Sequence, residues 1–228
     1  MAGLDSNVIW LSPCDGTDAS TSFPDSSQYA LSASAVGNAQ VDTAQQKFGT
    51  GSCLLDGSGD RVHIGDTALL DVGTGDFCVD SWVRFNSLAS GLCCFYEWGQ
   101  YSSGGWLAQL SGTTFQVYVN NNPVNFTWSP STATWYHLAV ERYSGNVYVY
   151  VDGTKLGAGQ ANAGDISGSS SGASFGDTHT LADRAVNGWM DEVRWSNVAR
   201  YQNTNFTPET SAYSAASTTK HLALLGVG

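Results

Sequence analysis

The carboxylates and histidines are the side chains whose spacing could support catalysis. Hydrolysis of a glycosidic bond with retention needs two carboxyl groups about 5 Å apart, one as nucleophile and one as proton donor. Alternate residues of a strand share a face, so two carboxylates separated by one residue could form such a pair. Four glutamates occur, and none has an acidic residue at that spacing: Glu97, Glu141, Glu192 and Glu209. Four histidines also occur, and none belongs to a recognisable Ser-His-Asp motif: His63, His137, His179 and His221. The sequence therefore predicts a protein that is not an enzyme.

One carboxylate has an unusual predicted environment. In GWMDEVRWSNVARY, which begins at Gly188, strict alternation places Asp191 on the same face as Trp189, Val193 and Trp195. A carboxylate buried among apolar side chains must accept hydrogen bonds or bind a cation. Backbone or tryptophan N–H donors and a calcium ion are the two alternatives that we consider.

Aromatic and polar side chains in three stretches could bind a sugar, because sugars stack on flat aromatic faces and donate hydroxyl hydrogens to carboxylates and amides. The stretches are FYEWGQYSSGGW, VNNNPVNFTW and FGDTHTLADR. The candidate ligand-binding residues in them are Trp98, Tyr101, Trp106, Asn121, Asp177 and His179. The alternative for each is a structural role, with tryptophan in the core and Asn or Asp serving a turn.

Charge and composition exclude several classes of partner. The chain has 9 basic and 20 acidic residues, a formal net charge of −11, and no Lys/Arg cluster that could displace the counterions of a nucleic acid. No stretch approaches the roughly 20 apolar residues of a membrane span, so membrane insertion is not expected. The N-terminus has neither a basic segment nor a long apolar run, which predicts no cleavable signal peptide.

The cysteines have no metal-binding or redox spacing. There are five of them, an odd number, and two are adjacent: Cys14, Cys53, Cys78, Cys93 and Cys94. No CxxC pair occurs. We expect small, buried and reduced side chains, although one disulfide remains an alternative.

Period-two alternation predicts the fold class. In FCVDSWVRF, Phe77, Val79, Val83 and Phe85 share one face, and WYHLAVERY and NVYVYVDG alternate in the same way. Glycine-rich turns separate these segments, and 141–147 is predicted to be a hairpin closed on a Gly-Asn turn. Short strands with such turns favour an all-β protein, a two-sheet antiparallel β-sandwich of the jelly-roll type.

The remaining segments are predicted as loops and short helices in one domain, 1–228, with a core at about 7–210. Ser20–Gln46 and Gly157–Ser174 lack a period and are expected to be surface loops. Helices are expected after Thr207, where Pro208 would occupy the first position, and around Asn197–Tyr201. The C-terminal tail, 211–228, is expected to form an added strand or the remnant of a second repeat.

Four motifs in order carry a resemblance to a known family: KFGTGSCLLDGSGDRVHI, GDFCVDSWVRF, WYHLAVERYSGNVYVYVDGTKL and GWMDEVRWSNVARY. Together, over about Asn7 to Thr210, they resemble the laminin G-like branch of the concanavalin A-like lectin/glucanase superfamily. The resemblance implies a jelly roll of the kind found in lectins, adhesion modules and phage surface proteins. It also implies a possible rim site for Ca²⁺, for which the candidate ligands are Asp15, Asp25 and Asp191.

These observations predict a non-catalytic carbohydrate-binding or adhesion module on a virus particle or another extracellular surface. The expected partner is a glycan or a host-surface polysaccharide, and other virion proteins or copies of the same chain are further partners. The alternative is a purely structural virion component, such as a capsid decoration, tail or fibre subunit. A glycoside hydrolase or lyase is the least favoured class, because the acid pair is missing.

Overall fold

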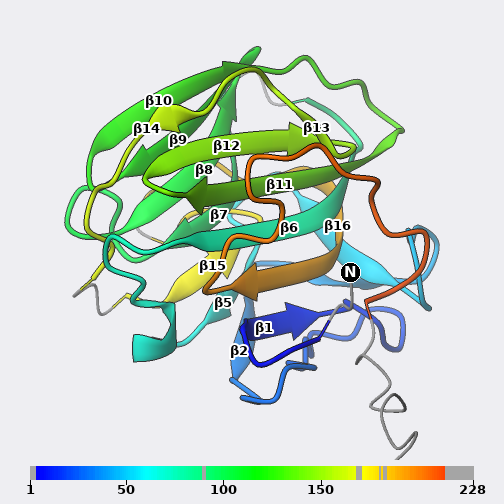
Figure 1. The fold of residues 1–228 in the computed structure, drawn as a ribbon. Coiled ribbons are helices and arrows are strands. Elements are labelled where there is room, and N and C mark those ends of the chain that lie inside the picture. The colour runs from blue at the N-terminus through cyan, green and yellow to red at the C-terminus, as the bar shows by residue number, and fades with distance from the viewer. Residues whose placement is uncertain (1–3, 89–90, 168–170, 180, 182–183, 214–228) are drawn as a thin grey trace, which may run out of the picture.

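The computed structural model describes residues 4–88, 91–167, 171–179, 181 and 184–213. In this part of the chain two antiparallel sheets pack face to face, which confirms the predicted β-sandwich (Figure 1). The one helix among the described residues is a single 3₁₀ turn, η1 (Ala68–Leu70), with Thr67 as its N-cap. No described helix is long and apolar enough to cross a bilayer.

The seven-stranded sheet has the order β10-β9-β8-β7-β15-β5-β2. Its strands are β2 (Ala33–Val36), β5 (Arg61–Ile64), β7 (Leu92–Trp98), β8 (Trp106–Ser111), β9 (Thr114–Val119), β10 (Asn122–Thr127) and β15 (Ala173–Phe175).

The nine-stranded sheet has the order β13-β12-β11-β6-β16-β4-β3, with β1 paired to β16 and β14 paired to β12. Its strands are β1 (Val8–Ser12), β3 (Gln40–Asp42), β4 (Ser52–Asp56), β6 (Phe77–Phe85), β11 (Trp135–Tyr143), β12 (Asn146–Val151), β13 (Thr154–Lys155), β14 (Gln160–Ala161) and β16 (Asn187–Ser196).

The main core lies between the two sheets and is built by alternate strand residues. Phe77, Val79, Val83 and Phe85 of β6 all belong to it, as their alternation predicts. Opposite them, β9 contributes Phe115, Val117 and Val119.

A β-bulge in β16 corrects the predicted alternation around Asp191. The pairing of β16 with β6 shifts register between Asp191 and Arg194, and Glu192 has a positive φ of 53°. The extra residue lets Met190 and Val193 both enter the core, whereas strict alternation would place them on opposite faces. Asp191 therefore does not share the core face of Val193 and Trp195.

The β11–β12 hairpin forms where it was predicted, with one correction to its turn. Tyr143 pairs with Asn146, so Ser144 and Gly145 are the two turn residues. Both have positive φ, 49° and 74°, which is the type I′ geometry that matches the twist of the strands.

The predictions of surface loops and short helices are partly wrong. Strands β2 and β3 lie within 20–46, and β14 and part of β15 within 157–174, because these short segments pair although they carry no period. Neither predicted helix forms: 197–201 is a bend and 207–210 is irregular chain. Of the predicted added strand, residues 214–228 lie outside the described residues.

The last described segment, 197–213, crosses the outer face of the nine-stranded sheet in front of β6, β11 and β12 (red-orange in Figure 1). Its Tyr201 and Phe206 stack on each other with ring centroids 3.6 Å apart. They pack with Cys78, Ala139 and Tyr150 in a second, smaller apolar cluster. This segment, here called the strap, covers the sheet face that carries the buried Asp80, Glu141 and Arg194.

All five cysteines are buried and none forms a disulfide. This confirms the expectation of reduced core side chains. Burial raises the pKa of the Cys93 thiol to about 12, so it stays protonated at neutral pH.

Candidate functional site

Two of the candidate aromatic residues are core residues. Trp98 is fully buried and Trp106 is 2% exposed, and both belong to the main core cluster. Trp106 stacks on Phe77 with ring centroids 4.8 Å apart and packs against Trp195 at 5.5 Å. We therefore correct their assignment from ligand binding to packing, because both rings are buried in the core.

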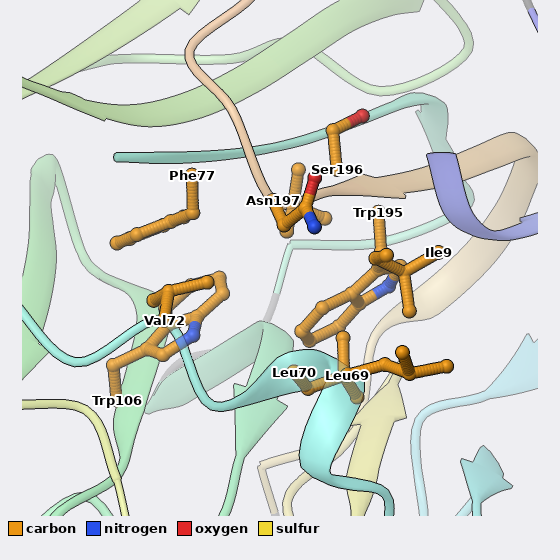
Figure 2. Close-up of a pocket in the computed structure, with 10 residues that line it drawn as sticks. Ile9, Leu69, Leu70, Val72, Phe77, Trp106, Trp195, Ser196 and Asn197 are labelled. Atoms are coloured by element: carbon orange, nitrogen blue, oxygen red, sulfur yellow. The ribbon is translucent and has the colours of Figure 1, made fainter. Parts of the chain in front are cut away.

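A small apolar pocket lies between the sheets where Trp106 meets Trp195 (Figure 2). Its walls come from both sheets and from η1: Ile9, Leu69, Leu70, Val72, Phe77, Val79, Trp106, Trp195, Ser196 and Asn197. Only the last two of these side chains are strongly polar, fewer hydrogen-bonding groups than recognition of a sugar with several hydroxyl groups requires.

Tyrosine and amide side chains gather on the outer face of the seven-stranded sheet. On β9, Gln116 and Tyr118 are partly exposed and alternate with buried core residues. The Tyr101 ring meets the Tyr118 ring edge-on at 5.3 Å, and the Tyr101 carbonyl accepts a hydrogen bond from the Asn121 backbone N–H at 2.6 Å. We call Tyr101, Gln116, Tyr118, Asn120 and Asn121 the tyrosine–amide patch.

The β9–β10 turn positions the asparagines of this patch. Asn120 and Asn121 form a two-residue hairpin turn with positive φ values of 47° and 62°, a conformation that asparagine tolerates better than most residues. The Asn120 Oδ1 accepts a hydrogen bond from Gly104 N at 3.2 Å, which ties the turn to the loop that carries Tyr101. The turn and this loop therefore hold the patch together.

A second polar group lies on the same sheet face and includes the other two ligand-binding candidates. The imidazole Nδ1 of His179 lies 2.8 Å from the buried Glu97 Oε2, and its ring centroid lies 5.3 Å from that of His63. Asp177 is 1% exposed, and its Oδ1 accepts the backbone N–H groups of Thr178 and Arg184. Asp177 therefore shapes the loop, and it is not accessible as a ligand-binding side chain.

Burial dominates the electrostatics of this group. It raises the pKa of Asp177 to about 6 against the two hydrogen bonds that lower it. Burial and the neighbouring His179 lower the pKa of His63, which keeps this imidazole neutral at pH 7.

The three candidate calcium ligands do not converge on one site. Asp15 accepts the backbone N–H groups of Thr50 and Gly51. Asp25 accepts those of Leu11, Ser27 and Leu31 and closes the turn that precedes β2. Within the described ranges no group of three His, Cys, Asp or Glu residues is arranged to hold a metal ion. The rim calcium site stays a prediction.

Backbone donors satisfy Asp191, one of the two alternatives derived from the sequence. Its Oδ2 accepts the N–H groups of Lys47 at 2.8 Å and Phe48 at 3.0 Å, and its Oδ1 accepts that of Glu192 at 2.8 Å. Burial nevertheless raises the pKa of Asp191 to about 8, and it raises that of the adjacent Glu192 to about 7. Both carboxyl groups therefore titrate near neutral pH in the folded protein.

These raised pKa values predict that stability falls as pH rises from 6.5 to 8. In that window the folded chain keeps protons on Asp191 and Glu192 that the unfolded chain has lost, so raising the pH favours unfolding. Burial lowers the pKa of His137 to about 4, and its opposing contribution fades as pH rises past the unfolded value of about 6.5. We expect urea unfolding to show a decreasing free energy of unfolding across the window and a shallower decrease in Asp191→Asn. An equal slope in both proteins would contradict this assignment.

The carboxylates of the nine-stranded sheet are engaged beneath the strap. Asp80 is fully buried and pairs with Arg194, with Oδ2 and Nη2 2.6 Å apart. Glu141 is also fully buried and accepts the Tyr150 hydroxyl at 2.7 Å and the Tyr201 backbone N–H at 2.9 Å. Neither carboxylate is placed to meet a glycosidic bond.

The fold and these motifs match one family. A family model of the laminin G type, described as concanavalin A-like lectin/glucanases superfamily, matches residues 56–204, more than half of the chain. The chain belongs to this superfamily. Most of the sandwich, from the end of β4 to the strap, lies within the match. A search of curated proteins finds no significant match.

Solved structures similar to this laminin G-like chain share its fold at low sequence identity. A botulinum neurotoxin type C structure, described as dependent for cell entry on two ganglioside molecules, has a TM-score of 0.64 and 15% identity, over 85% of this chain and 48% of that one. The binding domain of botulinum neurotoxin DC in complex with rat synaptotagmin II has a TM-score of 0.64 and 14% identity, over 85% of this chain and 49% of that one. A Trypanosoma rangeli sialidase mutant displaying trans-sialidase activity has a TM-score of 0.65 and 15% identity, over 91% of this chain and 33% of that one. The chain spans less than half the length of these proteins.

Sequence reasoning missed Gln116, Tyr118, Asn120 and His63. Gln116 and Tyr118 in TFQVYV and His63 in RVHI occupy alternate positions between buried residues, and Asn120 lies in the β9–β10 turn. The alternation of TTFQVYVN would have placed Tyr118 on the outer face, since Phe115, Val117 and Val119 have the opposite parity.

Proposed function

We propose that this protein is a non-catalytic carbohydrate-binding module that acts on an extracellular or particle surface and uses the tyrosine–amide patch. The observation that carries the proposal is the pair of partly exposed tyrosines, Tyr118 on β9 and Tyr101 in the β7–β8 loop, beside amide groups on β9 and in its tight turn. An aromatic ring gives a sugar a stacking face, and an amide both donates to and accepts from its hydroxyl groups.

Membership of a superfamily with lectins supports this proposal, as does the engagement of Asp80 and Glu141 in buried contacts. Hydrolysis needs an exposed acid pair, and these two carboxylates have instead Arg194 and the strap as partners. Binding without bond cleavage is therefore the favoured activity.

A glycan array screened with calcium and with a chelator tests the proposal. We expect a defined set of glycans to bind. Loss of binding in the chelator would support the rim calcium site that the family resemblance implies. A folded protein that binds no glycan in either condition would overturn carbohydrate binding and favour the structural alternative, a virion or fibre subunit.

Substitution of a patch tyrosine is expected to weaken binding. Tyr118→Ala removes a stacking ring, which we expect to cost about 1.4 kcal/mol, or about tenfold in Kd. Titration calorimetry with a glycan identified on the array measures the change. The matched control is Tyr143→Ala, which removes a half-buried tyrosine from the end of β11 on the other sheet. Equal losses in the two variants would place the binding site elsewhere.

A further inference from the structure

The tyrosine–amide patch lies in a long stretch of sequence without formal charge. No residue from 98 to 140 is Asp, Glu, Lys or Arg, although the chain has 29 such residues in total. This stretch contains the whole of β8, β9 and β10, which form one edge of the seven-stranded sheet. Its one histidine, His137, lies on the other sheet.

From this we infer that the patch selects uncharged glycans and discriminates against sialylated, uronic-acid and sulfated ones. The inference rests on the proposed function and specifies its ligand class. An anion that loses water at a binding site needs a cationic or strongly donating partner in exchange. The five patch residues supply phenol and amide groups, which suit hydroxyl groups and carry no positive charge to pair with a carboxylate or sulfate.

Among the described residues, one cationic group adjoins the patch, Arg184, and it acts through a chain of two glutamines and makes no contact with the tyrosines. The Arg184 guanidinium donates its Nη1 to Gln109 Oε1 at 2.7 Å, and Gln109 in turn donates its Nε2 to Gln116 Oε1 at 2.8 Å. Arg184 is thus linked through Gln109 to Gln116, the patch residue two positions before Tyr118 on β9. Two acidic groups lie farther off: Glu97 is buried on β7, two strands from β9, and is paired with His179. Asp165 lies in the loop whose Ser167 carbonyl is beside Gly104.

The overall charge acts in the same direction. The protein has a formal charge of −11, so an anionic glycan approaches against a repulsive field at low ionic strength. A neutral glycan meets no such barrier, and its affinity should be nearly independent of salt.

The experiment compares matched glycans that differ only in an acidic group. Sialylated glycans and their desialylated products, and sulfated glycans and their unsulfated counterparts, are titrated into the purified chain. We expect the neutral member of each pair to bind at least about tenfold more tightly, a factor that corresponds to one lost charge partner. Tighter binding of the acidic members would overturn the inference and leave carbohydrate binding intact. Absence of binding by every glycan would overturn the proposed function itself.

Two variants sharpen the result. Asn125→Lys places a cation on the exposed side of β10, opposite Gln116, while the Asn125 backbone keeps its contacts with Gln160. We expect it to improve binding of the acidic members several-fold and to leave the neutral ones unchanged. Arg184→Gln should leave neutral-glycan affinity within about twofold of the wild type. If acidic glycans bind and Arg184→Gln abolishes that binding, the guanidinium is the recognition group and the inference is wrong.

Discussion

Replacement of Asp80 by alanine is expected to lower the free energy of unfolding by about 3–5 kcal/mol. Asp80 is fully buried, and Arg194 binds it through two contacts, Nη2 to Oδ2 at 2.6 Å and Nε to Oδ1 at 3.0 Å. The Tyr201 hydroxyl donates a further hydrogen bond at 2.5 Å. Removal of the carboxylate leaves a guanidinium that is 3% exposed without its charge partner, and this isolated charge is the source of the loss.

The direction of the Asp80 pKa agrees with this role. Burial alone would raise the pKa, but the charge and hydrogen bonds of Arg194 outweigh burial and hold it below the ordinary value. Because the folded pKa is depressed, the stabilisation is present above pH 4 and is lost as pH falls through the folded pKa.

Urea unfolding at pH 7 measures the loss, and Asp5→Ala is the matched control. Asp5 also pairs with an arginine, Arg200, at 2.7 Å, but its side chain is 43% exposed. An exposed pair contributes about 0–1 kcal/mol, so the control should be nearly as stable as the wild type. The double variant Asp80→Leu/Arg194→Met removes both charges and should recover part of the stability. If the free energy of unfolding falls no more in Asp80→Ala than in Asp5→Ala, the buried pair is not a main stabilising contact.

Strands with an unbroken period were predictable from sequence because local alternation decides which side chains are buried. Phe77, Val79, Val83 and Phe85 of β6 enter the core as predicted. Strand β16 was not fully predictable, because the bulge at Glu192 requires a positive φ at a residue type that gives no sign of one. That single extra residue changes the face on which Asp191 lies.

The contacts that satisfy Asp191 also explain why sequence left two alternatives open. Its donors, the backbone N–H groups of Lys47 and Phe48, lie 144 and 143 positions away. Backbone N–H groups are present at nearly every residue, so no side-chain pattern marks the ones that will serve a distant carboxylate. Only the pairing of β16 with β4 places the segment before β4 near this carboxylate.

The candidate site likewise contains residues that the sequence placed correctly and residues that it did not. Tyr101 and Asn121 belong to the patch, because a loop and a tight turn leave them at the surface. Trp98 and Trp106 pair at the ends of β7 and β8, where parity alone decides between core and solvent. The sequence shows that the segment from Trp98 to Trp106 is rich in aromatic residues. Only the register of the strands shows which of these rings face the solvent.

The second large effect is expected at Arg142, where Arg142→Met should lower the free energy of unfolding by about 2–4 kcal/mol. This fully buried guanidinium donates to three backbone carbonyls: Gly75 O at 2.7 Å, and Gly73 O and Gly164 O at 2.6 Å each. Burial lowers its pKa to about 10, so it stays protonated at neutral pH and makes charge-assisted hydrogen bonds.

These hydrogen bonds join two loops that meet at one isolated bridge, Gly73 with Ile166. We therefore expect Arg142→Met to increase hydrogen exchange at the Gly73 and Ile166 amides before it affects the strands, because the loops lose their shared donor. In Arg142→Lys, hydrogen exchange at these amides should be faster than in the wild type and slower than in Arg142→Met. The lysine ammonium keeps the charge but lacks the planar guanidinium that can donate to three carbonyls. Arg84→Met is the control: Arg84 packs over the Trp189 ring at 5.0 Å on a partly exposed face, and its loss should cost less than about 1 kcal/mol. Unchanged exchange at Gly73 and Ile166 in Arg142→Met would show that the bridge holds the loops without the guanidinium.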